Sequence, residues 1–295
     1  MTTWRPCATL ATLQARAAIR DRIRTFFAER GVLEVDTPIL QGGANLDHGV
    51  VPMSCNGRWI PTSPEHPLKR LVAAGYGDVW TLSPACRAGE RGTRHQPEFR
   101  MLEWYRCGWD DARLAEETIA VLELATGLSG GAQRLSWRQA YLDVGIDPDA
   151  VVSQDGLSRE ERLDLILTER IEPRLGRGCW TILTDYPASG AAQARLRQDA
   201  AGRLVAARFE IYREGIELAN GYHECVDAAD LRSRHEHERA ARGVDAPPLD
   251  ARFHAMLADG FPDCAGVAIG FDRMIMLALA LPDVAATMAF DWDRA

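Results

Sequence analysis

Strand-like segments in this chain of 295 residues come as neighbouring pairs, and this arrangement constrains the fold more than any other feature. Residues 79–85 and 98–107 form one predicted pair across a polar segment, and residues 205–212 and 215–221 form another across a tight turn. The pattern is not the regular strand–helix alternation that builds a parallel sheet. It favours an α+β fold, with an antiparallel sheet flanked by helices.

Predicted helices lie between and around these pairs. Residues 12–30 carry apolar side chains on one face, and Gly31 follows where a glycine commonly ends a helix. The extended segment 32–40 contains Pro38, which has no N–H to donate, so we expect it at a sheet edge or an interface. Further helices are predicted at 111–126, 136–175 and 228–242, together with a buried apolar helix at 274–280. No linker divides the sequence, so we expect a single domain over 1–295.

Charge and cysteine content exclude several classes of protein. The formal net charge is −8, which disfavours extensive contact with nucleic acid, since such proteins are usually basic. The seven cysteines form no CxxC pair, so we expect reduced, mostly buried thiols rather than a disulfide framework or a zinc site. Because neither a signal peptide nor an apolar run of membrane-spanning length is evident, we expect a cytoplasmic protein that does not contact a membrane.

The first segment with chemical character is 87–106, RAGERGTRHQPEFRMLEWYR. It places Arg87, Arg91, Arg94 and His95 in a loop between two predicted strands. Guanidinium groups suit phosphate oxygens because each offers a planar pair of donors. A solvated basic loop is the alternative interpretation.

The second segment is 208–224, RFEIYREGIELANGYHE, in which a glutamate recurs every seven residues. A tight turn near 214 would bring Glu210 and Glu217 onto adjacent strands, where two carboxylates could hold Mg²⁺ on a polyphosphate. The alternative is that these glutamates face solvent between core residues, as Glu214 is expected to do.

The third segment is 266–273, GVAIGFDR, a strand that enters a helix. Gly266 and Gly270 allow close approach of the backbone. Arg273 lies in the first helical turn, which is unfavourable for the helix dipole, so an anionic partner is expected. An ion pair with Asp272 or another acid is an equally open interpretation.

Together and in this order, the last three segments resemble motifs 2 and 3 of class II aminoacyl-tRNA synthetases. Residues 26–40, FFAERGVLEVDTPIL, resemble motif 1, while TSPEHPLKRL (62–71) and IELANGYHE (216–224) resemble the lysyl-tRNA synthetase branch. Motif 1 begins within the first few dozen residues, so we expect no preceding anticodon-binding domain. The chain is therefore similar to the elongation factor P–lysine lysyltransferase family, which transfers lysine, preferably (R)-β-lysine, onto a lysine of elongation factor P.

The resemblance implies ATP and Mg²⁺ as cofactors and assigns roles to residues of this chain. Arg87 and Arg273 would be catalytic and hold the α- and γ-phosphates, and Glu210 and Glu217 would bind Mg²⁺. ATP would contact Arg87, Glu90, His95, Gln96, Phe99, Glu217, Leu218, Gly270 and Arg273, with Phe99 stacked on adenine. The substrate would contact Ser63, Pro64, Glu65, Tyr105, Asn220, Tyr222, Glu224 and Ala268, with Glu65 and Glu224 receiving its two ammonium groups.

Two departures from the family pattern concern the ATP site. The motif 2 arginine is followed by Ala88-Gly89 instead of Asn-Glu, with Glu90 one place late, and Gln96 replaces an asparagine. We also expect Ala268, which is usually glycine in lysyl-tRNA synthetases, to favour β-lysine over α-lysine.

The expected partners are lysine or β-lysine, elongation factor P and a second copy of the chain in a homodimer, but not tRNA. Two alternatives stay open: a paralogue that charges tRNA or another acceptor, and an inactive homologue with a regulatory or binding role. Adenylate formation needs positioning and charge neutralisation rather than a protein nucleophile, and no Ser-His-Asp or Cys-His arrangement is evident.

Overall fold

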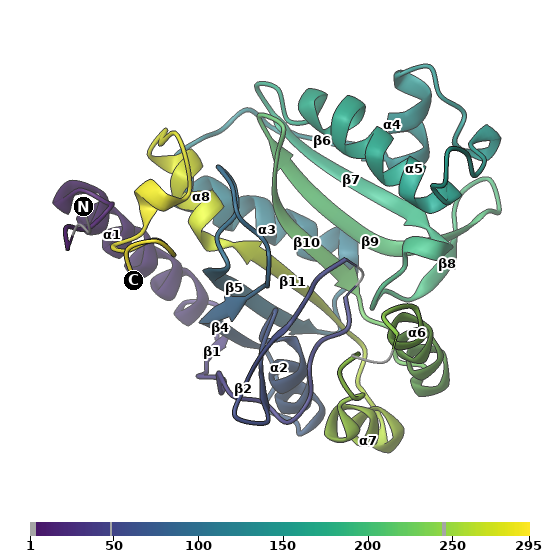
Figure 1. Ribbon diagram of the computed structural model, residues 1–295, viewed down its shortest axis with the longest axis horizontal. Helices are drawn as coiled ribbons and strands as arrows, with labels where there is room; N and C mark the ends of the chain where they lie inside the picture. The colour runs from purple at the N-terminus through teal and green to yellow at the C-terminus, as the bar shows by residue number, and fades with distance from the viewer. Residues whose placement is uncertain (1–3, 48, 244–245) are drawn as a thin grey trace.

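The fold is organised around one sheet of nine strands, seen in the computed structural model that describes residues 4–47, 49–243 and 246–295 (Figure 1). The strand order is β1-β4-β5-β11-β10-β9-β7-β6, with β8 beside β9. Its strands are β1 (Leu33–Glu34), β4 (Val79–Cys86), β5 (Glu98–Cys107), β6 (Ala132–Ser136), β7 (Trp180–Pro187), β8 (Leu196–Gln198), β9 (Leu204–Arg213), β10 (Ile216–His223) and β11 (Cys264–Gly270). A separate hairpin is formed by β2 (Met53–Cys55) and β3 (Arg58–Ile60).

Both predicted antiparallel pairs are confirmed, as β4 with β5 and β9 with β10. The second pair turns through Glu214 and Gly215, whose φ angles of 51° and 70° suit the tight two-residue turns of hairpins. The predicted antiparallel sheet flanked by helices is confirmed for most strand pairs, and at its two ends β1 with β4 and β6 with β7 run parallel. Strands β6 and β7 were not predicted from the sequence.

Helices cover the sheet and its edges (Figure 1). The two predicted helix ends at Gly31 and Gly127 are confirmed, each glycine having φ near 70°. Val32 N donates to Phe27 O and Gly31 N to Ala28 O, the two bonds of a Schellman motif. The α-helices are α1 (Leu10–Ala28), α2 (Glu65–Ala73), α3 (Asp111–Thr126), α4 (Trp137–Asp143), α5 (Arg159–Ile166), α6 (Ala228–Ala241), α7 (Ala251–Asp259) and α8 (Phe271–Ala278).

The region 136–175 is helical as predicted, but in pieces. It contains α4, α5 and three short turns of other helix types, η1 (Pro148–Ala150), η2 (Leu167–Ile171) and η3 (Glu172–Arg174). Two further short turns are η4 (Ala188–Gly190) and η5 (Ala285–Thr287). Neither α2 nor α7 was predicted. The segment containing Pro38 lies at the sheet edge as expected, although only Leu33–Glu34 of it pairs as a strand.

The largest hydrophobic cluster packs one face of the sheet against α1, α3 and α8. On β5, Leu102 and Trp104 point into this cluster and are fully buried. Because side chains alternate along a strand, Met101, Glu103 and Tyr105 point to the opposite face. The sheet thus keeps one face for the core and leaves the other for a cavity.

Within the described parts of the chain, no helix is long and apolar enough to cross a membrane. The prediction of mostly buried thiols is wrong in extent: Cys86, Cys225 and Cys264 are buried, whereas Cys55 is exposed. The other three cysteines are partly buried.

Candidate active site

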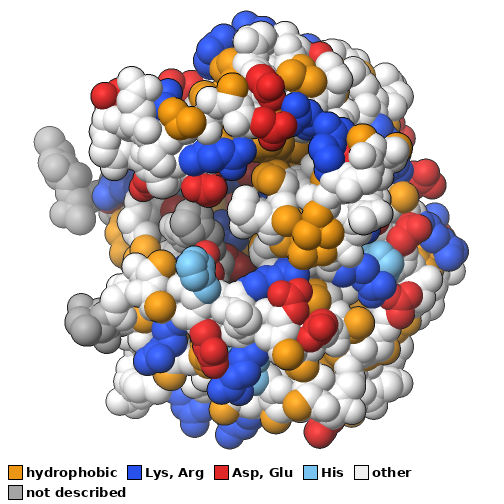
Figure 2. Space-filling model, turned by 90° about the vertical axis from the view of Figure 1, so that its right-hand side faces the viewer, with side chains coloured by type: hydrophobic (Ala, Val, Ile, Leu, Met, Phe, Trp, Pro, Cys, Tyr) orange, Lys and Arg blue, Asp and Glu red, His pale blue; other side chains and the backbone are white. Residues whose placement is uncertain are grey.

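A cavity of about 340 Å³ opens on the face of the sheet opposite the main core. Four neighbouring strands, β5, β11, β10 and β9, line its base with two rows of residues in register. One row is Glu103–Ala268–Asn220–Glu210, and the next is Tyr105–Gly266–Tyr222–Arg208. Residues directly opposite each other in a sheet project from the same face, so each row is a continuous strip of cavity wall. Figure 2 shows a hollow in one face of the molecule, with acidic and basic side chains in and around it.

Gly266 is a glycine because Tyr105 lies against it. A Cβ atom at this position would come within 2.3 Å of the Tyr105 ring and 2.7 Å of Glu224 Oε1. The predicted close approach at Gly266 is therefore confirmed. At Gly270 the nearest atoms to an added Cβ belong to Arg273, at 3.6 Å, so the protein itself does not require glycine there.

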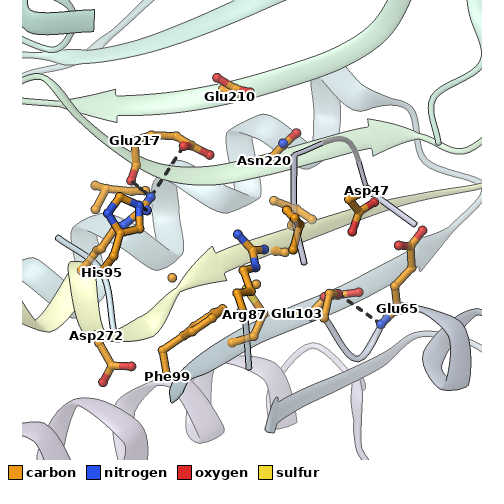
Figure 3. A pocket seen from close by; sticks show the side chains of 18 of the residues that line it. Asp47, Glu65, Arg87, His95, Phe99, Glu103, Glu210, Glu217, Asn220 and Asp272 are labelled. Carbon is orange, nitrogen blue, oxygen red and sulfur yellow. Dashed lines mark hydrogen bonds and ion pairs between the residues drawn. The ribbon is translucent and has the colours of Figure 1, made fainter. Parts of the chain in front are cut away.

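Charge is divided between the two ends of the cavity (Figure 3). His95 and Glu217 lie at one end and Asp47 and Glu65 at the other, with Arg87 between them.

Arg273 anchors the first end. Its guanidinium group donates to the carbonyl oxygens of Arg94 at 3.1 Å and Glu217 at 3.2 Å, and contacts the His95 ring. The expected acidic partner is Glu217, whose carboxylate lies 3.6 Å away. Asp272 is not that partner, because it pairs with Arg16 at 2.5 Å. Burial and the guanidinium of Arg273 lower the pKa of His95.

The loop before β5 supplies two further groups to this end. Arg87 lies 3.6 Å from Glu90, and its guanidinium group stands 5.2 Å from the centre of the Phe99 ring. Glu90 lines the cavity although it is displaced by one position from the family pattern. Arg94 also lines the cavity, whereas Arg91 pairs with Asp293 outside it.

Glu210 and Glu217 project into the cavity from adjacent strands, as predicted. Glu210 accepts hydrogen bonds from Arg208 at 2.6 Å and from Tyr212 at 2.5 Å. Burial and the proximity of Glu210 raise the pKa of Glu217. Two neighbouring carboxylates, one buried (Glu210) and one partly exposed (Glu217), are a favourable place for a cation, and magnesium prefers a few carboxylates together with phosphate oxygens.

The opposite end is acidic. Glu103 is 2% exposed and accepts hydrogen bonds from Ser63 and from the Tyr105 hydroxyl, the latter at 2.9 Å. Burial, with the nearby charge of Glu65, raises the pKa of Glu103 to about 8. Burial and Glu65 also raise the pKa of Asp47.

Beneath this end lies an ion cluster that sequence analysis missed. The Lys69 ammonium group lies 2.5 Å from Glu65 Oε1 and 2.6 Å from Glu224 Oε2. We call Lys69, Glu65 and Glu224 the lysine bridge. Burial opposes a charged lysine, but Glu224 and Glu65 outweigh it and raise the Lys69 pKa. For Glu224, burial outweighs Lys69 and raises the pKa to about 7.

Among the residues proposed from sequence, the structure brings all but two into the cavity wall. The exceptions are Pro64, which precedes the first turn of α2, and Glu224, which is 1% exposed beneath the cavity. Sequence analysis missed Asp47, Glu103 and Arg208 as cavity residues. Arg208 could have been found, since it lies two residues before Glu210 and so on the same strand face.

A signal for Lys69 was also present in the sequence. Lys69 is the one lysine among the 34 basic residues of the chain; the other 33 are arginines. It also follows Glu65 by four residues, the spacing that brings side chains together on a helix.

Comparison with known proteins agrees with this geometry. Residues 2–294 match the family described as tRNA synthetases class II (D, K and N). An "Elongation factor P--(R)-beta-lysine ligase" from Salmonella gallinarum (strain 287/91 / NCTC 13346) is 40% identical, over 99% of this chain and 98% of the relative. The protein of that name from Salmonella typhi is 39% identical with the same coverage. The chain therefore belongs to the class II tRNA synthetase family of the D, K and N type, in the same group as the elongation factor P–(R)-β-lysine ligases.

Proposed function

We propose that this chain uses ATP to activate (R)-β-lysine as an aminoacyl-adenylate and transfers it to a lysine of elongation factor P. The observation that carries the proposal is a cavity with Arg273 and His95 at one end, the carboxyl groups of Asp47, Glu65 and Glu103 at the other, and Arg87 between them. The first end suits a polyphosphate and the second suits the ammonium groups of a diamino acid. Identity of 40% with a ligase of this name, over nearly the full length of both chains, supports the same substrate pair.

At the basic end, Arg87 and Arg273 would neutralise phosphate charge as the α-phosphate is attacked. His95 would lie beside the outer phosphates, where burial and Arg273 lower its pKa in the free protein. Glu210 and Glu217 would hold Mg²⁺, which when bound would neutralise further phosphate charge. Phe99 offers a ring face for adenine, and Glu90, Gln96, Leu218 and Gly270 line the same part of the cavity.

At the acidic end, Glu65 and Glu103 would receive the two ammonium groups, with Asp47 adding negative charge nearby. Asn220 and Tyr222 would contact the rest of the substrate. We propose that Pro64 acts indirectly, by starting α2 so that Ser63 and Glu65 face the cavity. Glu224 would act through Lys69, because it lies outside the cavity wall.

The chemistry requires two bond exchanges. The substrate carboxylate displaces pyrophosphate from the α-phosphate of ATP, and the acceptor amine then displaces AMP from the mixed anhydride. The chain contributes mainly position and charge, because the ends of the cavity hold both anions and both ammonium groups while the reacting atoms meet between them. We place this reaction in the cytoplasm, where ATP and the proposed acceptor occur.

The proposal predicts ATP–pyrophosphate exchange that requires Mg²⁺ and a lysine isomer, with (R)-β-lysine preferred. In the presence of elongation factor P, mass spectrometry should show the acceptor gaining one lysyl unit. An acceptor variant with arginine at the modified lysine serves as the matched control, and tRNA should remain uncharged. Exchange without acceptor modification would favour the tRNA or other-acceptor alternative, and ATP binding without exchange would favour the inactive-homologue alternative.

Amino-acid binding should release protons near neutral pH. In the free protein burial raises the pKa of Glu103 to about 8, so this carboxyl is mostly protonated at pH 7. An ammonium group beside it lowers that pKa, so the proton leaves and affinity rises with pH toward about 8. Calorimetric titration at pH 7 in buffers of different ionisation enthalpy measures this, and a binding heat independent of the buffer would contradict it.

Ala268 is expected to favour β-lysine over α-lysine. It pairs in register with Glu103 on one side and Asn220 on the other, which puts its methyl group between two proposed substrate contacts. A methyl group in a packed pocket is worth about 1–3 kcal/mol of discrimination. Ala268→Gly should therefore shift the ratio of kcat/KM values toward L-α-lysine by roughly 5- to 150-fold. An unchanged ratio would mean that the methyl group does not set specificity.

We also propose that two copies of the chain associate. The exposed apolar side chains of Leu33, Ile39 and Leu40 lie at or just beyond the short edge strand β1. An uncovered edge with apolar neighbours favours association. Sedimentation at micromolar concentration should show twice the mass of one chain, and a single species of one-chain mass would refute the proposal.

A further inference from the structure

The lysine bridge joins separate parts of the fold by a single cation. Glu65 and Lys69 are one turn apart on α2, and Glu224 follows β10, far along the chain. The Lys69 side chain is 1% exposed, as is that of Glu224. The ammonium group also lies about 6 Å from the ring centres of Tyr105 and Phe253, which help to enclose it. Removing such a cation would leave two carboxylates facing each other in a nearly dry interior.

The residue type at this position is itself informative. Every other Lys or Arg position of the chain carries arginine, including Arg106, which is buried between Asp78 and Glu117, whereas the position between Glu65 and Glu224 carries lysine. An ammonium group is a compact charge with donors in three directions, whereas a guanidinium group is a wider planar fork. The position between Glu65 and Glu224 is therefore filled by a compact cation that can donate to both carboxylates.

The net charge of the lysine bridge shows how much negative charge is left to interact with a ligand. Two carboxylates and one ammonium group leave the lysine bridge with one net negative charge when all three are ionised. Glu65 lines the cavity, and its second oxygen, Oε2, accepts a long hydrogen bond from the Asn45 amide, at 3.4 Å. Glu224 does not line the cavity. The remaining negative charge is therefore available to the cavity through Glu65.

We infer that Lys69 is a positioning residue for amino-acid specificity: it neutralises Glu224, holds Glu65 toward the cavity, and leaves one negative charge there for one substrate ammonium group. This inference rests on the proposed function and deepens it. The second ammonium group then faces Glu103, on the other side of the acidic end. A substrate with a single ammonium group would leave one of these two carboxylates without a partner, which disfavours ordinary monoamino acids.

The test is a cycle of four proteins: wild type, Glu224→Gln, Lys69→Met and the double variant. In Glu224→Gln, Lys69 has only Glu65 as a partner and neutralises it, so the KM for β-lysine should rise about 10- to 100-fold. The KM for ATP should change by less than about threefold, because ATP binds at the other end. In Lys69→Met, Glu65 and Glu224 should share a proton, which turns Glu65 away from the cavity. The KM for β-lysine should rise by a similar factor.

The double variant distinguishes a positioning role of Lys69 from a purely structural role. It lacks both members of the Lys69–Glu224 pair and restores one net negative charge on Glu65, while the new glutamine side chain supplies a neutral amide donor beneath it. It should recover most of the affinity for β-lysine lost in Glu224→Gln. A purely structural lysine predicts the reverse, a double variant no better than either single variant, and that result would overturn the inference.

A second measurement needs no substrate. Thermal unfolding of the same four proteins should show the double variant melting at a higher temperature than Lys69→Met, because it no longer buries two carboxyl groups that must share a proton. A double variant that melts no higher would also overturn the inference. Absence of exchange in the wild type would instead count against the proposed function, so the two failures are distinguishable.

Discussion

One buried ammonium group holds the acidic end of this cavity together. Burial and the charge of Glu65 raise the pKa of Asp47, Glu103 and Glu224, and among the described residues Lys69 is the cation that contacts both Glu65 and Glu224 at ion-pair distance. Desolvation makes such a group of carboxylates costly unless a cation is enclosed with it. The enclosed lysine therefore permits a pocket that is strongly acidic and still folded.

The sheet fixes the positions of the two ends of the cavity relative to each other. Strands β5, β11, β10 and β9 are neighbours, and their register aligns Glu103, Ala268, Asn220 and Glu210 in one row. The row leads from the acidic end to the carboxylates expected to hold magnesium. At the far end of the same strands, Arg273 contacts the carbonyl of Glu217 and the ring of His95. A rigid sheet with its other face packed in the core can thus fix the separation of two reactants.

Much of this arrangement could be predicted from the sequence where the determinants are local. Gly31 and Gly127 end their helices, and the turn at Glu214 and Gly215 pairs its strands, through bonds within a few residues. The same turn was predicted to bring Glu210 and Glu217 onto adjacent strands, where the structure has them. The parallel pairing of β6 with β7 joins segments more than forty residues apart, and no local pattern predicts it.

The site residues that were not predicted from the sequence were missed for other reasons. Asp47 comes from a loop whose path depends on tertiary packing, and Glu103 lay in a recognised strand without a motif to single it out. Lys69 was overlooked because a lysine on a helix is ordinarily solvated. Its uniqueness among 34 basic residues becomes informative only once its enclosure by Glu65 and Glu224 is known.

Because the chain contains one lysine, its ammonium group can be observed directly. Protein labelled with ¹⁵N at the lysine side chain should give one ammonium signal in a nitrogen-15 NMR spectrum. We predict a protonated group whose hydrogens exchange slowly and which stays charged above the pH at which free lysine titrates. The signal should shift on addition of β-lysine and respond little to ATP. A rapidly exchanging signal that titrates like free lysine, and that is indifferent to both ligands, would contradict an enclosed cation beneath the substrate site.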